Sequence, residues 1–427
     1  MEDVNAAPRA VIVVTGSELV RGDRRDLNGP FLASQLLRLG LEPARIVIVG
    51  DAEEELAAAL SEASTADLCV VSGGLGPTHD DRTVELVARA AGVGLHVDES
   101  LNREIEGISR RFADRLGRPY VDFEAGVRKQ ATIPDGALSL GLAGTAPGLV
   151  LERKASVFVV LPGPPGELQR LWAGALETEP VRRVLARARP PELRRLRFFG
   201  VSESTVAKAF AAAGGDGDGV EATICARDFE IHVDLVVAPG AEKRADDLSG
   251  RLVAPLECYL FSRDTRPIEE LVLDRCRDLG LKLATAESCT GGMIAERLTS
   301  VPGSSDVFVG SIVSYADSVK SGQLGVPDET LQRHGAVSAE TAEAMALGAR
   351  ERLRADVALA VTGIAGPGGG TEEKPVGLVY LHAAGPRAER SADFVFPGDR
   401  ESVRRRAAVT ALHLMRRLLQ QSRDESV

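Results

Sequence analysis

Two long segments of this 427-residue chain alternate apolar runs with amphipathic runs, and this alternation constrains the fold more than any other feature. The apolar runs of the first segment have the length and composition of buried strands: RAVIVVTG (9–16), RIVIVG (45–50), ADLCVVSGG (66–74) and ASVFVVLPG (155–163). The runs between them repeat their apolar residues at helical spacing, and Asn28 is expected to cap the first helix. Buried strands that alternate with helices predict a parallel sheet covered on both faces.

The composition changes near residue 170 and again near residue 263, which predicts three domains. Residues 1–170 are expected to form a three-layer α/β/α domain and residues 171–262 a small α+β domain. Residues 263–427 again alternate strands and helices, which indicates a second α/β domain. The arginine-rich run from 182 to 197 is interpreted as a solvated helix. At about 150 residues per domain, the chain length agrees with this division.

Charge and cysteine content exclude several classes of protein. The net charge of −11 argues against general affinity for nucleic acid or for an anionic membrane. No stretch reaches the roughly 18 apolar residues of a membrane span, and the N-terminal residues do not resemble a secretory signal. The five cysteines are odd in number and lack zinc-site spacing, so a reduced cytoplasmic protein is expected.

The stretch AESCTGG, residues 286–292, places two candidate nucleophiles, Ser288 and Cys289, where a strand meets a helix. Such a turn exposes a hydroxyl beside free backbone N–H groups, as in a nucleophile elbow. Gly291 and Gly292 would let a substrate approach the backbone, and the N–H groups of the helix could stabilise an oxyanion. The alternative is that the turn needs small residues for steric reasons only.

A serine nucleophile needs a base, and Tyr315 and Lys320 in SIVSYADSVK are the candidates. A lysine that is desolvated in a pocket can lose its proton, whereas most lysines are solvated at the surface. Further along, a glycine-rich loop in TGIAGPGGGTEEKPVG could cradle a phosphate or a ribose. Arg400, Arg404 and Arg405 begin the last helix, where they suit a phosphate or form a solvated basic face.

These blocks, over about residues 265–420, resemble the C-terminal domain of the CinA family, the nicotinamide-nucleotide amidohydrolases. The resemblance implies hydrolysis of the carboxamide of nicotinamide mononucleotide to nicotinate mononucleotide and ammonia, without a cofactor. It implies Ser288 as the nucleophile, activated by Tyr315 with Lys320, and Cys289 as a neighbour. The resemblance also implies these substrate contacts: Thr290, Gly291, Gly292, Thr362, Gly363, Gly366 and Arg400. Among them, Arg400 is expected to bind the phosphate.

The loop SGGLGPTHDDRT, residues 72–83, follows a strand of the first segment and precedes a helix. Thr78 and Asp81 have the spacing of a capping box, which is one interpretation. The other adds Asp80, because two carboxylates beside an anion-binding loop suit a divalent metal that bridges phosphates. Glu18 lies at the end of the first strand. The carboxyl ends of the strands in such a parallel sheet form the ligand crevice.

This first region resembles the molybdopterin-binding-like domain of CinA proteins, in which the implied activity is metal-dependent hydrolysis of ADP-ribose to AMP and ribose 5-phosphate. The implied metal is Mg²⁺, Mn²⁺ or Co²⁺, held by Asp80 and Asp81. The implied substrate contacts are Glu18, Asn28, Gly73, Gly74, Gly76 and Thr78. His79 stands where the family usually has Asn, and SLGLAGTAPG replaces a usual N-P-V-G-T-A-P-G.

The middle region resembles a KH-type domain, but its GGDGDG loop is acidic where an RNA-binding loop is basic. We therefore expect a homodimeric, bifunctional nucleotide-salvage enzyme whose partners are small nucleotides, with no nucleic acid and no membrane. One alternative is a molybdopterin-binding protein with an accessory C-terminal unit. Another is a competence-associated protein whose N-terminal domain is not catalytic.

Overall fold

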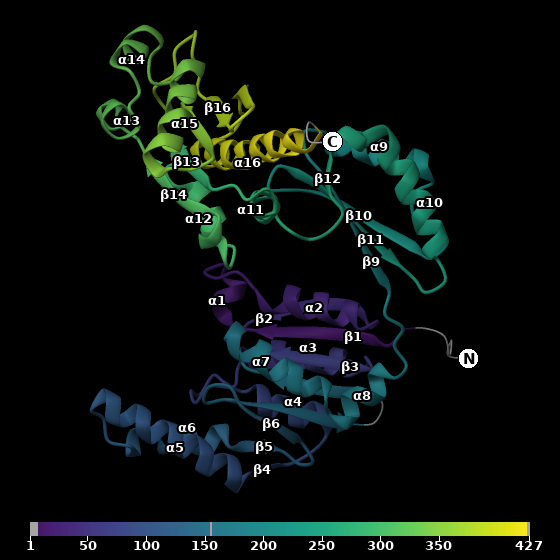
Figure 1. Cartoon of the computed structure of the whole chain (residues 1–427). Coiled ribbons are helices and arrows are strands. Elements are labelled where there is room, and N and C mark those ends of the chain that lie inside the picture. The colour runs from purple at the N-terminus through teal and green to yellow at the C-terminus, as the bar shows by residue number, and fades with distance from the viewer. Residues whose placement is uncertain (1–6, 154–155, 425–427) are drawn as a thin grey trace. The chain divides into compact units, whose positions relative to one another are not determined.

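The structure is a computed structural model that describes residues 7–153 and 156–424 and divides the chain into two compact units (Figure 1). The N-terminal unit contains Met1–Leu193 and Val236–Glu242, and the C-terminal unit contains Arg194–Leu235 and Lys243–Val427. Helix α7 (Pro165–Leu176) crosses residue 170, so the first compact unit extends beyond the first expected domain. No helix among the described residues is long and apolar enough to cross a membrane.

A six-stranded sheet with the order β2-β1-β3-β8-β7-β6 forms the centre of the N-terminal unit. Its strands are β1 (Arg9–Thr15), β2 (Glu42–Val49), β3 (Leu68–Ser72), β6 (Leu138–Leu142), β7 (Pro147–Arg153) and β8 (Ser156–Leu161). The first four strands in this order are mutually parallel, as expected, but β7 and β6 are antiparallel additions. The parallel sheet expected from these four strands is confirmed, and the antiparallel edge adds to it, because the short link from β6 to β7 leaves no room for a crossover helix.

Helices cover both faces of this sheet, because successive residues of each strand point to opposite sides. Along β1, Ile12 and Val14 pack against one group of helices, and Val13 packs against the other. The first group is α2 (Asn28–Arg38), α7 and α8 (Glu179–Leu185). The second group is α3 (Glu53–Ala63), α4 (Thr83–Ala91), α5 (Glu99–Leu116) and α6 (Val121–Gln130), with the small hairpin β4 (Leu95–Val97) and β5 (Thr132–Pro134).

The C-terminal unit begins with an α+β segment whose four-stranded sheet has the order β10-β11-β9-β12. Its elements are β9 (Glu192–Phe198), α9 (Glu203–Ala213), β10 (Val220–Arg227), β11 (Glu230–Val237), α10 (Glu242–Val253) and β12 (Leu260–Ser262). The expected solvated helix over 182–197 is wrong in its second half, because α8 ends at Leu185 and β9 begins at Glu192. Arg197 is buried on that strand and forms an ion pair with Asp234 at 2.7 Å.

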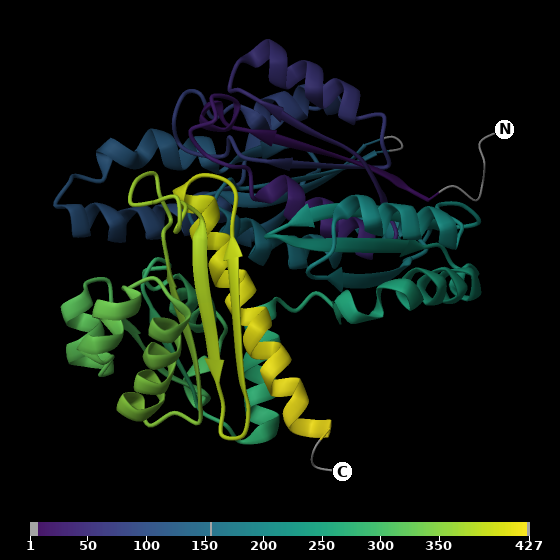
Figure 2. The same cartoon turned by 90° about the horizontal axis from the view of Figure 1, so that it is seen from above.

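The rest of the C-terminal unit surrounds a five-stranded sheet with the order β14-β13-β15-β16-β17. The strands are β13 (Leu283–Glu287), β14 (Phe308–Val313), β15 (Val357–Gly363), β16 (Leu378–Ala384) and β17 (Glu389–Val395). The helices are α11 (Ile268–Leu279), α12 (Met293–Thr299), α13 (Asp317–Leu324), α14 (Asp328–His334), α15 (Ala339–Leu353) and α16 (Arg400–Asp424). Strands β14, β13 and β15 are parallel, and β16 and β17 are antiparallel, running beside α16 in Figure 2.

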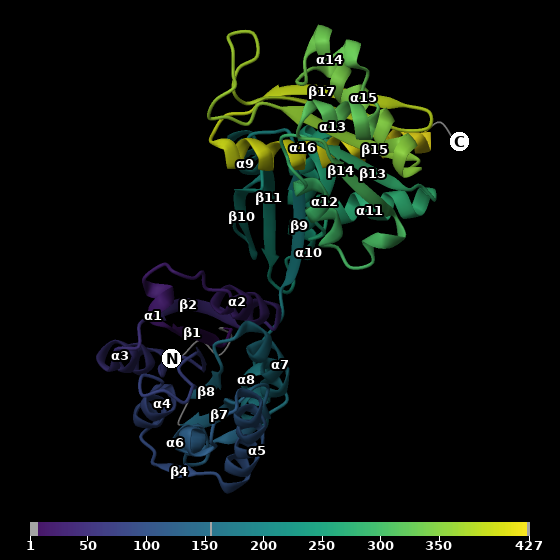
Figure 3. The same cartoon turned by 90° about the vertical axis from the view of Figure 1, so that its left-hand side faces the viewer.

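The two faces of this sheet carry side chains of different size. The larger residues Leu283, Val357 and Leu359 face α11, α12 and α16. The intervening residues Ala284, Ala286, Ala358 and Ala360 face α13 and α15, which are seen in Figure 3. Alanines bring α15 close to the strands, and Gly348 of α15 touches α13 so closely that a Cβ there would lie 1.8 Å from the carbonyl oxygen of Leu324.

Candidate active sites

Ser288 lies in the turn between β13, which ends at Glu287, and α12, which begins at Met293, as the sequence predicted. Its backbone N–H donates to the carbonyl oxygen of Val361 on β15 at 2.9 Å. The residue is 8% exposed, so it is reached from one side only. The strand-turn-helix geometry of a nucleophile elbow is therefore present.

The carboxylate of Glu287 occupies the N-terminal end of α12. It is fully buried and accepts hydrogen bonds from the backbone N–H groups of Gly292, Ile294 and Ala295 at 2.9, 3.1 and 2.9 Å. The hydroxyl of Ser311 donates to the same carboxylate at 3.4 Å. The expectation that these helix N–H groups stabilise an oxyanion is therefore wrong, because a side chain already uses them. Sequence reasoning missed Glu287, although an acid directly before a strand-helix turn is a usual signal of such capping.

Lys320 is a buried cation that is linked to this turn through Ser314. It lies in the first turn of α13 and is 1% exposed, and its Nζ donates to the carbonyl oxygens of Ser314 and Tyr315 at 3.0 and 3.4 Å. Ser314 is held beside the turn, because its N–H donates to the carbonyl oxygen of Glu287 at 2.8 Å. Burial lowers the pKa of Lys320, and the carboxylate of Asp317 at 3.7 Å opposes that shift. The alternative of a solvated surface lysine does not apply.

The hydroxyl of Tyr315 is hydrogen-bonded to Arg400 and not to Lys320. Its ring is exposed, and its hydroxyl accepts a hydrogen bond from the guanidinium of Arg400 at 2.7 Å. The hydrogen bond from Lys320 Nζ to Tyr315 goes to the carbonyl oxygen of this tyrosine. Arg400 also donates to the carbonyl oxygen of Gly366, at 2.7 Å. The structure thus brings Tyr315, Arg400 and Gly366 together as one group, and the tyrosine hydroxyl belongs to that group.

The other expected substrate contacts of this unit line the same strand ends. Thr362 is fully buried at the end of β15, and its hydroxyl donates to the carbonyl oxygen of Ala336 at 2.6 Å. Thr290 is also fully buried, and its Oγ1 has no hydrogen-bond partner among the described residues. Gly291 and Gly292 have φ values of 61° and 94°, which glycine adopts without strain. Gly363 lies so close to β16 that a Cβ would meet the carbonyl oxygen of Leu378 at 2.8 Å.

Arg404 contacts the turn from α16, and Cys289 lies buried within the turn. The guanidinium of Arg404 donates to the carbonyl oxygens of Cys289 and Thr290 at 3.0 and 2.8 Å, and so fixes the turn from α16. Burial raises the pKa of the Cys289 thiol to about 12, so this thiol is not a thiolate near neutral pH. Arg405 forms an ion pair with Asp228 of the α+β segment, so of the three arginines only Arg400 contacts Tyr315 and Gly366.

In the N-terminal unit, Asn28 fixes the strand ends. It is buried, and its amide nitrogen donates to Ser72 Oγ at 2.9 Å and to the carbonyl oxygen of Gly163 at 2.7 Å. It does not cap α2: Asp26 accepts the N–H groups of Asn28 and Gly29 instead. The expected cap is therefore wrong by two residues, because the side chain of Asn28 is hydrogen-bonded to Ser72, which ends one strand of the sheet, and to Gly163, which follows another.

The glycine loop after β3 closes on Asp81. The N–H of Thr78 donates to the carboxylate of Asp81 at 3.0 Å, and the hydroxyl of Thr78 donates to the same oxygen. This contact closes the loop and does not cap α4, which begins only at Thr83, so the capping-box interpretation is wrong in its location. A Cβ on Gly76 would lie 2.4 Å from the carboxylate of Asp81, so this close approach requires glycine.

No group of three or more His, Cys, Asp or Glu side chains that could hold a metal ion occurs among residues 7–153 and 156–424. Glu18 lies exposed in the short helix α1 (Ser17–Val20) and does not complete a three-acid set with Asp80 and Asp81. Asp80 and Asp81 are adjacent in the sequence, and an ion such as Mg²⁺ keeps several waters and takes one or two carboxylates beside phosphate oxygens.

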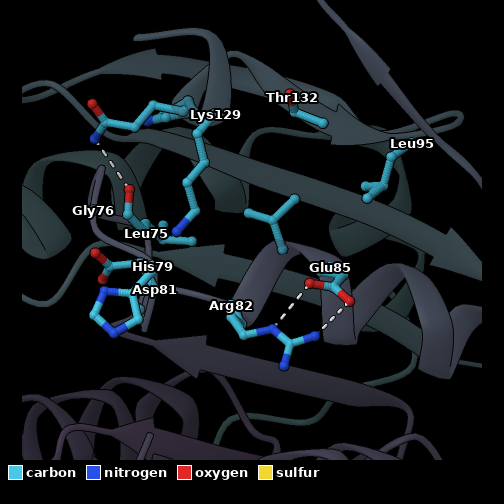
Figure 4. A pocket seen from close by; sticks show the side chains of 13 residues that line it. Leu75, Gly76, His79, Asp81, Arg82, Glu85, Leu95, Lys129 and Thr132 are labelled. Carbon is cyan, nitrogen blue, oxygen red and sulfur yellow. Dashed lines mark hydrogen bonds and ion pairs between the residues drawn. The ribbon is translucent and has the colours of Figure 1, made fainter. Parts of the chain in front are cut away.

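A cavity of about 370 Å³ lies beside this loop in the N-terminal unit. Figure 4 shows Lys129 reaching from α6 toward Leu75 and Gly76, with the Arg82–Glu85 ion pair farther along the wall. The Nζ of Lys129 donates to the carbonyl oxygen of Thr78. The lining of the cavity combines this polar rim with an apolar wall. It includes three residues that the sequence analysis expected at the site: Gly74, Gly76 and Asp81.

Known proteins match both units. Residues 265–419 match the family described as CinA C-terminal domain, and residues 11–181 match the probable molybdopterin binding domain. A CinA-like protein of Mycobacterium sp. (strain MCS) is 45% identical over 423 residues, which cover 96% of this chain and 99% of the relative. A CinA-like protein of Mycobacterium tuberculosis (strain ATCC 25177 / H37Ra) is 41% identical, over 96% of this chain and 97% of the relative.

Among solved structures, the competence/damage inducible protein CihA from Agrobacterium tumefaciens is 44% identical to the part it matches. The match covers 38% of this chain and 100% of that chain, with a TM-score of 0.35. The full-length relatives are what decide the family: at more than 40% identity they share nearly the whole length of this chain, with both matched domains inside it. This chain therefore belongs to the CinA family.

Proposed function

We propose that the C-terminal unit hydrolyses the carboxamide of nicotinamide mononucleotide to nicotinate mononucleotide and ammonia. The observation that carries this proposal is Lys320, a lysine that is 1% exposed and whose pKa is lowered by burial beside the Ser288 turn. A buried neutral amine is a base that can take the proton of a serine hydroxyl. Ser288, rather than the buried thiol of Cys289, is the residue such a base would activate.

In the proposed reaction, the neutral amine of Lys320 takes the proton from Ser288 Oγ as this oxygen attacks the carboxamide carbon. The protonated Lys320 then gives its proton to the departing amide nitrogen, which leaves as ammonia, and Ser288 carries a nicotinoyl ester. A water molecule then gives a proton to Lys320 as it attacks the ester carbon. Lys320 returns this proton to Ser288 Oγ as the ester bond breaks, so nicotinate mononucleotide leaves and both side chains regain their starting protonation. The two carbonyl oxygens that accept from Lys320 match the two N–H groups of a neutral amine and leave its lone pair for this transfer.

The phosphate of the substrate would meet Arg400. Its exposed guanidinium is already directed by the carbonyl oxygen of Gly366 and the hydroxyl of Tyr315, so little ordering is needed when an anion binds. Arginine suits a phosphate because it presents several donors in a fixed plane. We infer that Tyr315 contributes to this binding through Arg400.

The test measures ammonia release from nicotinamide mononucleotide by the purified full-length protein. We expect release by the wild-type protein and none above background by Ser288→Ala, with Cys289→Ala as the matched neighbour. Absence of ammonia with the wild-type protein over a range of pH would reject the proposed reaction.

We also propose that the N-terminal unit hydrolyses ADP-ribose to AMP and ribose 5-phosphate with a divalent metal. The cavity beside Asp81, with Lys129 at its rim, favours an anionic ligand of nucleotide size. Asp80 and Asp81 would hold the metal, which when bound would neutralise the pyrophosphate and polarise its oxygens. Glycines 73, 74 and 76 would let the pyrophosphate approach the loop N–H groups.

The assay for this second reaction is AMP production from ADP-ribose with Mg²⁺, Mn²⁺ or Co²⁺. EDTA is expected to stop AMP production and to leave ammonia release from nicotinamide mononucleotide unchanged. If no metal supports AMP production, the N-terminal unit is a binding module without this activity.

A further inference from the structure

The carboxylate of Glu287 is buried next to the proposed nucleophile and accepts hydrogen bonds from four donors of the protein. A carboxylate removed from water costs free energy unless its oxygens are hydrogen-bonded. Here the donors are three backbone N–H groups at the start of α12 and the hydroxyl of Ser311 on β14. The positive end of the helix dipole lies at the same place and further favours a negative charge.

The backbone of Glu287 is fixed as firmly as its side chain. Within the sheet it pairs with Val313 of β14 on one side and with Val361 of β15 on the other. Its carbonyl oxygen accepts the N–H of Ser314, the residue whose own carbonyl oxygen accepts from Lys320. Glu287 therefore connects, through direct contacts, the turn that carries Ser288, the first turn of α12 and the segment that holds the Lys320 amine.

We propose that Glu287 is a positioning residue that sets the orientation of Ser288 relative to Lys320, an inference that rests on the proposed amidohydrolase function. Because Glu287 occupies the N–H groups of Gly292, Ile294 and Ala295, the oxyanion of the reaction must be met elsewhere. The glutamate thus removes the helix N–H groups as an anion site and orients the turn that carries Ser288.

Only a glutamate fits this role. Glutamine has a single acceptor oxygen, and its NH₂ group would face a backbone N–H, so at least one of the three amides would lose its partner. Aspartate keeps the charge, but its carboxylate is one methylene short of the helix. Each change leaves the buried surroundings in place and alters only how firmly the turn is held.

The experiment compares Glu287→Gln and Glu287→Asp with Ser202→Ala in the full-length protein. Ser202 caps α9 through the N–H of Thr205, so its loss removes a comparable helix cap in the same unit, away from the turn. For Glu287→Gln we expect kcat for nicotinamide mononucleotide to fall by about ten- to a hundredfold, which corresponds to one charge-assisted hydrogen bond. KM is expected to stay within about twofold, since substrate binding is unchanged.

Two readouts do not depend on the substrate: the rate at which a fluorophosphonate labels Ser288, and hydrogen exchange at the amides of Ile294 and Ala295. We expect slower labelling and faster exchange in both Glu287 variants, and no change in Ser202→Ala. If the wild-type protein releases no ammonia, the proposed function fails, while these two readouts still decide the role of Glu287. The inference would be overturned if Glu287→Gln had the labelling rate and the kcat of the wild-type protein. If the glutamine variant does not fold, the same comparison is made with Glu287→Asp.

Discussion

The electrostatic balance at Lys320 gives a quantitative prediction. Asp317 lies one helical turn before it, with a carboxylate oxygen 3.7 Å from Nζ, and raises the pKa of this lysine against the lowering caused by burial. Replacing Asp317 by Asn removes the charge and keeps the side-chain size. The pKa of Lys320 should therefore fall, and a larger fraction of Lys320 should be neutral at each pH below that pKa.

The magnitude follows from the distance and the exposure. The side chain of Asp317 is 63% exposed, so a water-like dielectric is appropriate. Coulomb's law then gives about 1 kcal/mol at 3.7 Å, which corresponds to about a sixfold change in the neutral fraction. Below the pKa, the rate of a reaction that requires neutral Lys320 should rise by the same factor of about six.

The assay is ammonia release from nicotinamide mononucleotide between about pH 5 and 9.5, at low salt and again at high salt. The wild-type rate should increase with pH until Lys320 is neutral, and the rising part of the Asp317→Asn profile should lie at lower pH. High salt should reduce the difference, because the carboxylate is exposed. Lys320→Met and Lys320→Arg are the controls, and both should lose about 10²–10⁴-fold in rate, since neither side chain can accept a proton.

Several results would refute this reasoning. A flat wild-type profile would exclude a titrating lysine base over that range. A profile of Asp317→Asn that moves to higher pH, or does not move at low salt, would show that the carboxylate does not act on the reacting amine. Substantial activity in Lys320→Arg would mean that the positive charge, and not the base, is what the reaction needs.

Three further predictions concern the two sites. In an ammonia assay, Cys289→Ala should retain most deamidase activity and Ser288→Ala none, because burial keeps the thiol protonated. The reverse result would identify Cys289 as the nucleophile. Arg400→Ala should weaken binding of the mononucleotide by about 1.5–3 kcal/mol, which is measured as a higher KM, and should leave KM for nicotinamide riboside nearly unchanged. Equal effects on both substrates would show that Arg400 does not contact the phosphate. Asp81→Ala should abolish AMP production from ADP-ribose while ammonia release continues; AMP production at the wild-type rate would exclude Asp81 as a ligand.

Much of the architecture could be predicted from the sequence, because strands buried on both faces read as continuous apolar runs. The strands around Val70 and Leu359 are examples, and both lie at the centre of their sheets. The direction of β7 could not be read in this way, since an apolar run has the same composition in parallel and antiparallel pairing. The strand β9 was missed because its arginines suggested a helix, whereas Arg197 forms its ion pair with Asp234, a residue distant in the chain.

The candidate sites show the same limit. Ser288 and Lys320 could be proposed from short motifs, because each needs only its local turn or helix. The partner of Tyr315 is Arg400, 85 residues away, and this pairing is visible only when β15 and α16 are in place. Asn28 was similarly misassigned, because its amide is directed at Gly163, 135 residues further along. Contacts across such distances carry no periodic signal in the sequence.

The unequal faces of the C-terminal sheet have a consequence for how this unit tolerates substitution. On the side of Leu359, a lost methylene leaves a void that neighbouring large side chains can partly fill. The side of Ala358 and Ala360 is more tightly packed, because these alanines pack against α15, and a Cβ on Gly348 of α15 would meet the backbone of α13. Helix α13 carries Lys320, so a larger side chain on the alanine side is expected to displace the helix that holds this amine. Sequence drift should therefore be tolerated on one face of the sheet and suppressed on the other.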